Sequence, residues 1–187
     1  MKKYTVAEIK TFLKAMDDFA IAGSEIILIG GSAAALAYSV VDTTQDIDSW
    51  NNVDRVKEAY EKAKVSTGLY IPFGKVSVSD GPYNFEDRLI DFEPESFKNL
   101  HVKVPEVIDL ILMKTVRAYE HDLNAIEQMI KTQNVHLGDL VERYIAEMGS
   151  VVIVTKAGLD LHFLAMIGRC YGEKAAFKIQ EKIEYKA

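Results

Sequence analysis

The residue types that could bind a charged ligand are concentrated between Ile29 and Trp50. This stretch reads IGGSAAALAYSVVDTTQDIDSW, an apolar residue, the turn Gly30-Gly31-Ser32, small residues and then Asp46-Ile47-Asp48. Two carboxylates separated by one residue suit a divalent cation such as Mg²⁺, which prefers oxygen ligands. Glycines that follow a strand and open a helix let a phosphate approach the backbone N–H groups there. The stretch therefore combines two features needed to bind a nucleoside triphosphate with a metal ion.

Each of these features has a simpler explanation when it is taken alone. A lone Asp-x-Asp is more often a pair of solvated aspartates at the end of a strand, and most Gly-Gly pairs are only turns. Ser32 is the natural cap of the helix or, alternatively, a hydroxyl donor to a phosphate oxygen. We expect Asp46 and Asp48 to share one face of a strand, because side chains at i and i+2 point the same way. The functional interpretation depends on both features occurring together.

Helices and short strands are expected to position these residues. Thr5 and Glu8 have capping-box spacing at the start of the first helix, Asn52 is a candidate helix cap, and Pro105 suits a first helical turn. The helices are predicted at residues 6–20, 32–38, 51–63, 107–130, 137–148, 157–172 and 173–185. The strands are predicted at residues 25–29, 44–49, 70–71, 75–79, 88–92 and 101–104.

These elements predict an α+β fold, with a mixed β-sheet flanked by helices and a helical C-terminal part. The composition changes near residue 105 from mixed α and β to wholly helical. The predicted organisation is therefore an α/β core over residues 1–104 and a helical subdomain over residues 105–187. A chain of 187 residues is long enough to bury a proper core.

Composition excludes several classes of protein. The single cysteine, Cys170, excludes an internal disulfide framework and a cysteine-built zinc site, which favours a reducing cytoplasm. A net charge of −6 argues against a broad, non-specific nucleic-acid surface, and no DNA partner is expected. The longest apolar run is far shorter than a membrane span, so no membrane association is expected. A local basic patch for RNA stays compatible with this charge.

The motif residues carry a resemblance to a known superfamily. Gly30-Gly31-Ser32, a short helix and then Thr44-x-Asp46-x-Asp48 resemble the signature of the nucleotidyltransferases that include polymerase beta. The chain is most similar to bacterial nucleotidyltransferase-like proteins related to abortive-infection and toxin–antitoxin systems. The stretch DLILMKTVRAYEHDLNAI resembles their second conserved region, a lysine, then a basic residue, then an aspartate. Here those positions are Lys114, Arg117 and Asp122, and the resemblance spans about residues 25–130.

The resemblance implies a metal site built from three carboxylates. Two Mg²⁺ (or Mn²⁺) ions would be held, one activating an acceptor hydroxyl and one binding the triphosphate and the leaving pyrophosphate. Asp46 and Asp48 would be ligands, with Asp91 in RLIDF as the best candidate for the third. Glu93, expected on the same strand face as Asp91, is the alternative. Several of these proteins have an arginine four residues before the first aspartate, where this chain has Asp42.

The resemblance also assigns roles to the remaining motif residues. The residues implied in catalysis are Asp46, Asp48, Asp91 and Lys114. The residues implied in nucleotide binding are Gly30, Gly31, Ser32, Thr44, Lys114, Arg117 and Asp122. In one continuous helix, Arg117 and His121 would lie within about 60° of Lys114. The simpler explanation is a solvated basic stripe; the functional one is that Lys114 reaches the triphosphate, Arg117 assists and Asp122 fixes the basic group.

Two functions follow from this resemblance. The first is a metal-dependent nucleotidyltransferase that moves a nucleoside monophosphate from a nucleoside triphosphate to a protein or RNA acceptor. Such an enzyme would act as a toxin or defence component, with a cognate antitoxin or another partner protein. The alternative is a catalytically inactive nucleotidyltransferase-like protein that binds nucleotide or regulates a partner. Pyrophosphate release separates the two.

Overall fold

The chain divides into two compact units in the computed structural model, which describes residues 2–40, 43–76 and 80–184. The first unit consists of Met1–Ser77 and Leu89–Pro105, and the second of Val78–Arg88 and Glu106–Ala187. Residues 78–88 are thus grouped with the helical unit, whereas the predicted boundary between residues 104 and 105 would place them in the α/β core. The mixture of helices and short strands confirms the predicted α+β class. No helix among the described residues is long and apolar enough to cross a membrane.

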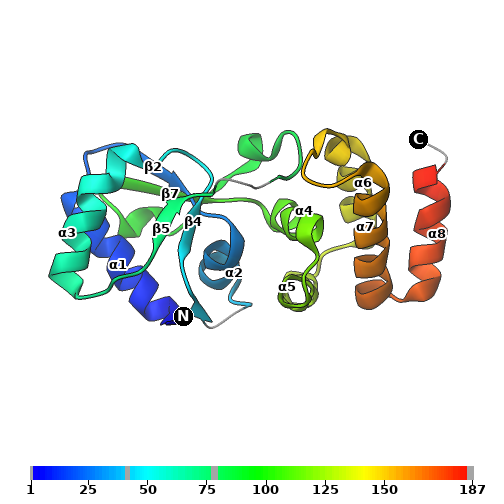
Figure 1. Cartoon of the computed structure of the whole chain (residues 1–187), viewed down its shortest axis with the longest axis horizontal. Coiled ribbons are helices and arrows are strands. Elements are labelled where there is room, and N and C mark those ends of the chain that lie inside the picture. The colour runs from blue at the N-terminus through cyan, green and yellow to red at the C-terminus, as the bar shows by residue number, and fades with distance from the viewer. Residues whose placement is uncertain (1, 41–42, 77–79, 185–187) are drawn as a thin grey trace. The chain divides into compact units, whose positions relative to one another are not determined.

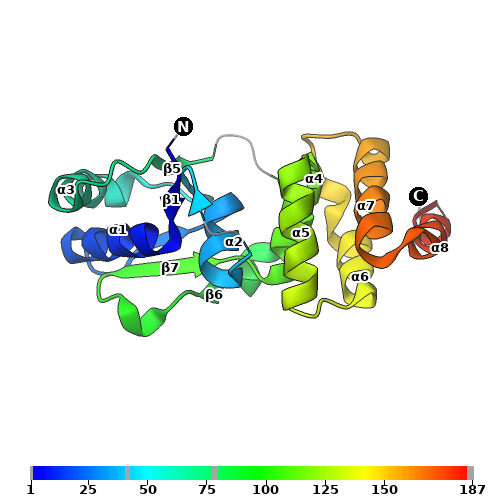
Figure 2. The same ribbon diagram turned by 90° about the horizontal axis from the view of Figure 1, so that it is seen from below.

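Helices account for most of the regular structure (Figures 1 and 2). Those of the first unit are α1 (Val6–Phe19), α2 (Gly30–Tyr38) and α3 (Lys57–Thr67). Those of the second unit are α4 (Val107–Arg117), α5 (Glu120–Thr132), α6 (Leu137–Glu147), α7 (Lys156–Tyr171) and α8 (Glu173–Glu184). Short 3₁₀ turns lie at Asp54–Val56, Phe85–Arg88, Pro94–Ser96 and Met148–Ser150.

The strands of the first unit form a mixed layer in the order β5–β4–β2–β7–β6. They are β2 (Ser24–Ile27), β4 (Ile47–Ser49), β5 (Phe73–Lys75), β6 (Ile90–Asp91) and β7 (Leu100–Val104). The pairs β2–β7 and β4–β5 are parallel, and β6–β7 is antiparallel. An antiparallel bridge between Leu28 and Ser49 joins β4 to the end of β2. A separate antiparallel pair is formed by β1 (Tyr4–Thr5) and β3 (Thr43–Thr44).

The first helix folds as its sequence predicts. The Thr5 hydroxyl accepts the N–H of Glu8, and the Glu8 carboxylate accepts the N–H of Thr5, which completes the capping box. The apolar residues that recur at helical spacing are fully buried, at Ile9, Phe12, Leu13 and Met16. Helix α1 packs these residues beside α3, and the two helices lie side by side in both ribbon views (Figures 1 and 2).

Three predicted helix features are wrong. The carbonyl oxygen of the Asn52 side chain accepts the N–H of Asp54 in a 3₁₀ turn, so α3 begins later than predicted and Asn52 does not cap it. Pro105 precedes the N-cap residue of α4 and lies outside its first turn. The predicted helix 107–130 breaks at Ala118, whose φ of 50° is left-handed, and continues as α5. The other predicted helices of the C-terminal part are confirmed by α6, α7 and α8.

The predicted strands are shorter than their sequence patterns. The strand predicted at 44–49 divides into β3 and β4, and Asp46 lies in the connection between them. Residues 70–71 form no strand; their carbonyl groups instead accept the hydroxyls of Tyr4 and Tyr60. The strand predicted at 75–79 ends as β5 at Lys75, and residues 77–79 lie outside the described residues. The strands predicted at 25–29, 88–92 and 101–104 are confirmed by β2, β6 and β7.

Asp17 anchors the start of β7 to the end of α1. Its fully buried carboxylate accepts the backbone N–H groups of Lys98, Asn99 and Leu100 at 2.7 to 3.0 Å. Burial alone would raise the pKa of Asp17, but these hydrogen bonds and Lys14 hold the pKa below its usual value. The ionised carboxylate therefore stabilises the folded chain.

Replacing Asp17 with alanine is expected to lower the free energy of unfolding by about 3 kcal/mol, because three backbone N–H groups lose their acceptor, the buried one of Leu100 and the partly buried ones of Lys98 and Asn99. Urea denaturation at pH 7 measures the change. Since the folded pKa is lowered, the contribution is present above the unfolded pKa of about 3.9 and is lost as the pH falls through the folded value. The difference between wild type and variant should therefore narrow below about pH 4. The exposed neighbour Asp18→Ala is the control, and an equal loss in both variants would contradict the prediction.

Candidate functional site

The first glycine of the motif lies directly against the second aspartate. The backbone N–H of Ile29 donates to the carbonyl oxygen of Asp48 at 3.0 Å, which places β4 beside the start of α2. A Cβ built on Gly30 would lie 2.8 Å from Oδ2 of Asp48, so the carboxylate occupies the space that any side chain would need. Gly30 also has a left-handed φ of 64°. Both observations require glycine at the point where α2 meets the carboxylate.

The second glycine contacts the threonine of the motif in the same way. A Cβ on Gly31 would lie 3.0 Å from Oγ1 of Thr44, a contact tighter than ordinary packing. The Thr44 hydroxyl donates to the carbonyl oxygen of Asp46 at 3.2 Å, which positions the backbone just before β4. The glycine pair, Thr44 and the aspartate pair are thus assembled in one place within the first unit.

Ser32 is not the cap that the sequence predicts. Helix α2 begins at Gly30, its N-cap residue is Ile29, and no side chain caps it. The Ser32 hydroxyl is buried and donates to the carbonyl oxygen of Ile29 at 2.9 Å. The first N–H groups of a helix have no acceptor within the helix, so the start of α2 remains suited to an anion. The alternative role of the Ser32 hydroxyl, donation to a phosphate oxygen, stays a prediction.

The aspartate pair alternates with a buried residue. Ile47 is fully buried, whereas Asp46 and Asp48 are partly exposed, so both aspartates lie on the side away from the core. Asp48 is in β4, and Asp46 immediately precedes that strand. Partly exposed carboxylates of this kind are ligands that suit a divalent cation, and the buried isoleucine between them fixes the backbone.

The structure does not bring Asp91 to the aspartate pair. Asp91 is in the edge strand β6, opposite Lys103 of β7, and Lys103 in turn is opposite Ile27 of β2. Because β4 lies beyond β2, three strand spacings separate β6 from β4, or about 14 Å. Carboxylates that share one Mg²⁺ each lie about 2.1 Å from the ion. Among the described residues, no three Asp, Glu, His or Cys side chains are grouped to hold a metal ion.

The sequence predicts that Glu93 shares a strand face with Asp91, and this prediction is wrong. Strand β6 ends at Asp91, and Glu93 has a left-handed φ of 43° at the start of the next 3₁₀ turn. Its carboxylate forms an ion pair with Lys10 of α1. Lys103, opposite Asp91, is paired with Glu25 at 2.8 Å, and this hydrogen bond raises the pKa of Lys103. Glu93 and Lys103 are therefore each paired with a residue other than Asp91.

The basic residues of the second motif form a cluster within the second unit. Lys114, only 5% exposed, places Nζ 3.0 Å from Oδ1 of Asp122, and Nη2 of Arg117 lies 3.2 Å from the same oxygen. The helix breaks at Ala118, and α5 starts in a new direction that brings Asp122 to both bases. The predicted contact of Asp122 with the basic group is confirmed. His121 lies on α5 and not on the helix of Lys114, which differs from the prediction of one continuous helix.

One oxygen of this cluster has no hydrogen-bond partner among the described residues. Asp122 is fully buried, and its Oδ2 accepts no hydrogen bond, although Nε2 of His121 lies 3.7 Å away. A buried carboxylate of this kind depends strongly on its remaining cations. Lys114 is therefore a structural partner of Asp122, and its predicted role at the triphosphate stays a prediction.

Replacing Lys114 with methionine is expected to lower the free energy of unfolding by about 3 kcal/mol, because Asp122 keeps only the half-exposed Arg117. Urea denaturation measures the loss. The double variant Lys114→Met with Asp122→Leu should recover part of it, since the uncompensated buried charge is gone. The exposed Lys131→Met is the control. Equal stability of Lys114→Met and wild type would show that the pair contributes nothing in solution.

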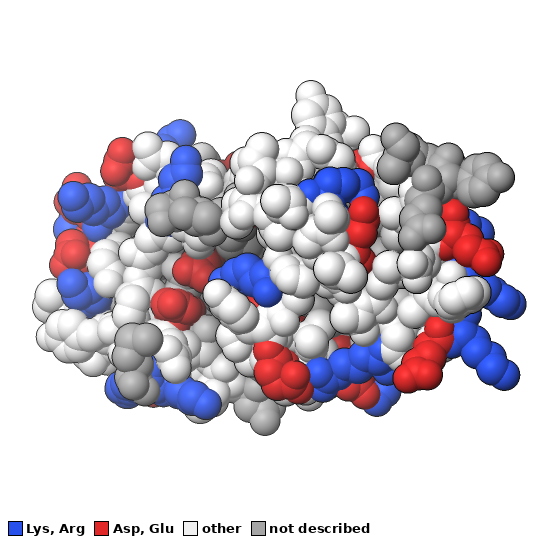
Figure 3. All heavy atoms as spheres, turned by 45° about the vertical axis from the view of Figure 1, so that its right-hand side comes forward, with Lys and Arg blue, Asp and Glu red and all other residues white. Residues whose placement is uncertain are grey.

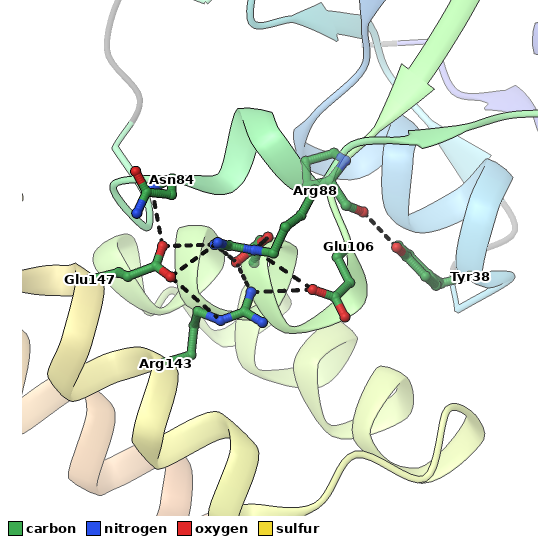
Figure 4. A network of polar contacts seen from close by, with 8 residues as sticks. Tyr38, Asn84, Arg88, Glu106, Arg143 and Glu147 are labelled. Carbon is green, nitrogen blue, oxygen red and sulfur yellow. Dashed lines mark hydrogen bonds and ion pairs between the residues drawn. The ribbon is translucent and has the colours of Figure 1, made fainter.

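A second group of charges was not predicted from the sequence (Figure 4). Arg88 forms forked hydrogen bonds with Asp109 and with Glu147, and Arg143 contacts both of these carboxylates and Glu106. The hydrogen bonds to Asp109 are the largest cause that raises the pKa of Arg88. Only Arg143 and Glu147 have a spacing, i and i+4, that sequence alone could connect. The network ties residues 84–88 to α4 and α6.

A family model described as a nucleotidyltransferase of unknown function (DUF6036) matches residues 5–161. No curated protein and no solved structure matches the chain significantly. The matched stretch includes the glycine pair, the aspartate pair and the cluster around Asp122.

Proposed function

Because the chain belongs to this family of nucleotidyltransferases, we propose that it binds a nucleoside triphosphate with a divalent metal ion and transfers the nucleoside monophosphate to an acceptor. The contact between Gly30 and Asp48 carries the proposal. It joins a helix start suited to an anion to a carboxylate suited to a cation, so closely that a Cβ built on Gly30 would lie 2.8 Å from Oδ2 of Asp48. A triphosphate with its bound cation needs both kinds of group side by side.

The residues at this contact fit a divalent cation, because their carboxylates are hard oxygen ligands and Gly30 leaves the space beside Oδ2 without a side chain. Asp46 and Asp48 would hold Mg²⁺ or Mn²⁺, which, when bound, neutralises the triphosphate and stabilises the leaving pyrophosphate. The backbone N–H groups at the start of α2 would orient the phosphates. Thr44, which is close to Gly31 and hydrogen-bonded to the carbonyl oxygen of Asp46, would fix the aspartate pair beside that helix start.

The acceptor in this proposal is a hydroxyl group of a protein or of RNA. On the face drawn in Figure 3, basic and acidic side chains are interspersed among the described residues, without an extended area of one sign. With a net charge of −6, this pattern favours recognition of a particular acceptor over general attraction to nucleic acid. We extend the proposal to a cytoplasmic toxin or defence component that a cognate antitoxin or other partner protein controls.

The position of Asp91 favours a second candidate function. A third carboxylate on a strand about 14 Å from β4 cannot complete the metal site that the family resemblance implies. A protein with this arrangement could bind the triphosphate and act as a regulatory partner without transferring anything.

Transfer from labelled nucleotides tests the proposal. The full chain is incubated with each of the four α-³²P nucleoside triphosphates and Mg²⁺ or Mn²⁺, with bacterial protein extract and total RNA as acceptors. We expect label on one acceptor class and stoichiometric pyrophosphate, both abolished by EDTA, because the cation holds the triphosphate. Metal-dependent binding without pyrophosphate release would select the second candidate. Absence of metal-dependent nucleotide binding would overturn both.

A further inference from the structure

The strands on either side of β4 bring no carboxylate to Asp48. Strands β4 and β5 lie side by side (Figure 1). In this parallel pair, Asp48 is directly opposite Gly74. Paired residues of neighbouring strands point to the same face, so residue 74 is the position next to the Asp48 carboxylate, and it has no side chain. On the other side, Asp48 is bonded to the backbone of Ile29, an apolar residue. Neither neighbour can add a ligand.

The remaining acidic residues of the sheet are not near this position. Asp91 is on the far edge, opposite Lys103, and Glu25 is paired with Lys103. A second divalent ion would lie about 3.5 to 4 Å from the first and would need a further protein ligand beside the two aspartates. Among the described residues, no third Asp, Glu, His or Cys side chain is grouped with Asp46 and Asp48 to supply one.

We propose that this site holds one divalent cation, the one that accompanies the triphosphate, instead of the two that the family resemblance implies. The inference rests on the proposed function, because it concerns the same aspartate pair. The one bound cation supports nucleotide binding. A second cation would lack a ligand because residue 74, next to Asp48, is a glycine.

The number of bound Mn²⁺ ions tests this inference without any measurement of activity. Electron paramagnetic resonance of free Mn²⁺ counts the ions bound to the full chain in the presence of α,β-methylene analogues of the four nucleoside triphosphates. We expect one ion per chain in wild type. The variant Gly74→Asp adds a carboxylate beside Asp48 and should bind two. A Cβ at residue 74 meets no atom within 4 Å, so the substitution has room.

Matched variants make the result specific. Gly74→Asn has the same shape without the charge and should bind one ion. Asp91→Asn should also leave the count at one, as should Asp42→Asn, which changes a carboxylate outside the described residues. Two ions in wild type would overturn the inference, and so would one ion in Gly74→Asp, which would show that residue 74 is not beside the cation. Binding of neither ion nor nucleotide would instead overturn the proposed function.

Discussion

Asp48→Asn is expected to reduce nucleotidyl transfer by about 10³-fold, roughly 4 kcal/mol of transition-state stabilisation. Asparagine keeps the size of the side chain, so the packing of residue 48 on Gly30 is retained. What is lost is one of the two charges that hold the cation against the triphosphate. The rate of pyrophosphate release measures the effect, and the affinity for Mn²⁺ should fall together with the rate.

The control is the same substitution at an exposed position of α6, Asp139→Asn, which should transfer at the rate of wild type. Thermal denaturation of Asp48→Asn should match wild type, which separates loss of the charge from loss of the fold. A folded Asp48→Asn protein that still transfers at more than a tenth of the wild-type rate would remove Asp48 from the site. Gly30→Ala should also lower the affinity for nucleotide, because its Cβ would displace the same carboxylate.

That the glycine pair and the aspartate pair contribute to one candidate site could be predicted from sequence, because each half of the site is local. An apolar strand, a glycine pair and small helical residues fix the turn, and the alternation of Asp46, Ile47 and Asp48 fixes which side chains face away from the core. Few residues lie between these two segments. This short connection limits how the segments can be arranged relative to each other.

The place of Asp91 in the sheet could not be predicted, because it depends on which strands are neighbours. RLIDF has the alternating pattern of a strand whichever partner it takes, and the pattern does not show that β6 pairs with β7 instead of β4. The break at Ala118 is equally invisible, since alanine is the best helix former and nothing near it marks a left-handed residue. Arg88 and Asp109 meet across 21 positions of sequence, beyond any local signal.

Arg88→Met is expected to lower the free energy of unfolding by about 3 to 4 kcal/mol. Asp109 is fully buried, and Arg88 forms a fork with it through Nε at 3.1 Å and Nη2 at 3.0 Å. A second fork reaches Glu147 at 2.7 Å and 3.0 Å. Methionine fills much of the same volume but leaves Arg143 as the one cation beside both carboxylates among the described residues. Breaking a buried pair from one side leaves an uncompensated charge, which is the main cost.

The pH dependence of this loss follows from Glu147. Burial would raise the pKa of Glu147, but the hydrogen bonds from Arg88 and from the N–H of Asn84 hold the pKa below its usual value. A lowered folded pKa contributes stability above the unfolded pKa of about 4.3, and this stability is lost as the pH falls through the folded value. Urea denaturation of wild type and Arg88→Met should therefore differ most near neutral pH and converge below about pH 4.

Two further variants separate geometry from charge. Arg88→Lys keeps the positive charge but cannot form two forks, so we expect an intermediate loss of about 1 to 2 kcal/mol. Lys178→Met removes an exposed charge from α8 and should change stability by less than about 0.5 kcal/mol. If Arg88→Met were as stable as Lys178→Met, the forks would contribute nothing in solution. If Arg88→Lys were as unstable as Arg88→Met, the forked geometry rather than the charge would hold residues 84–88 on α4 and α6.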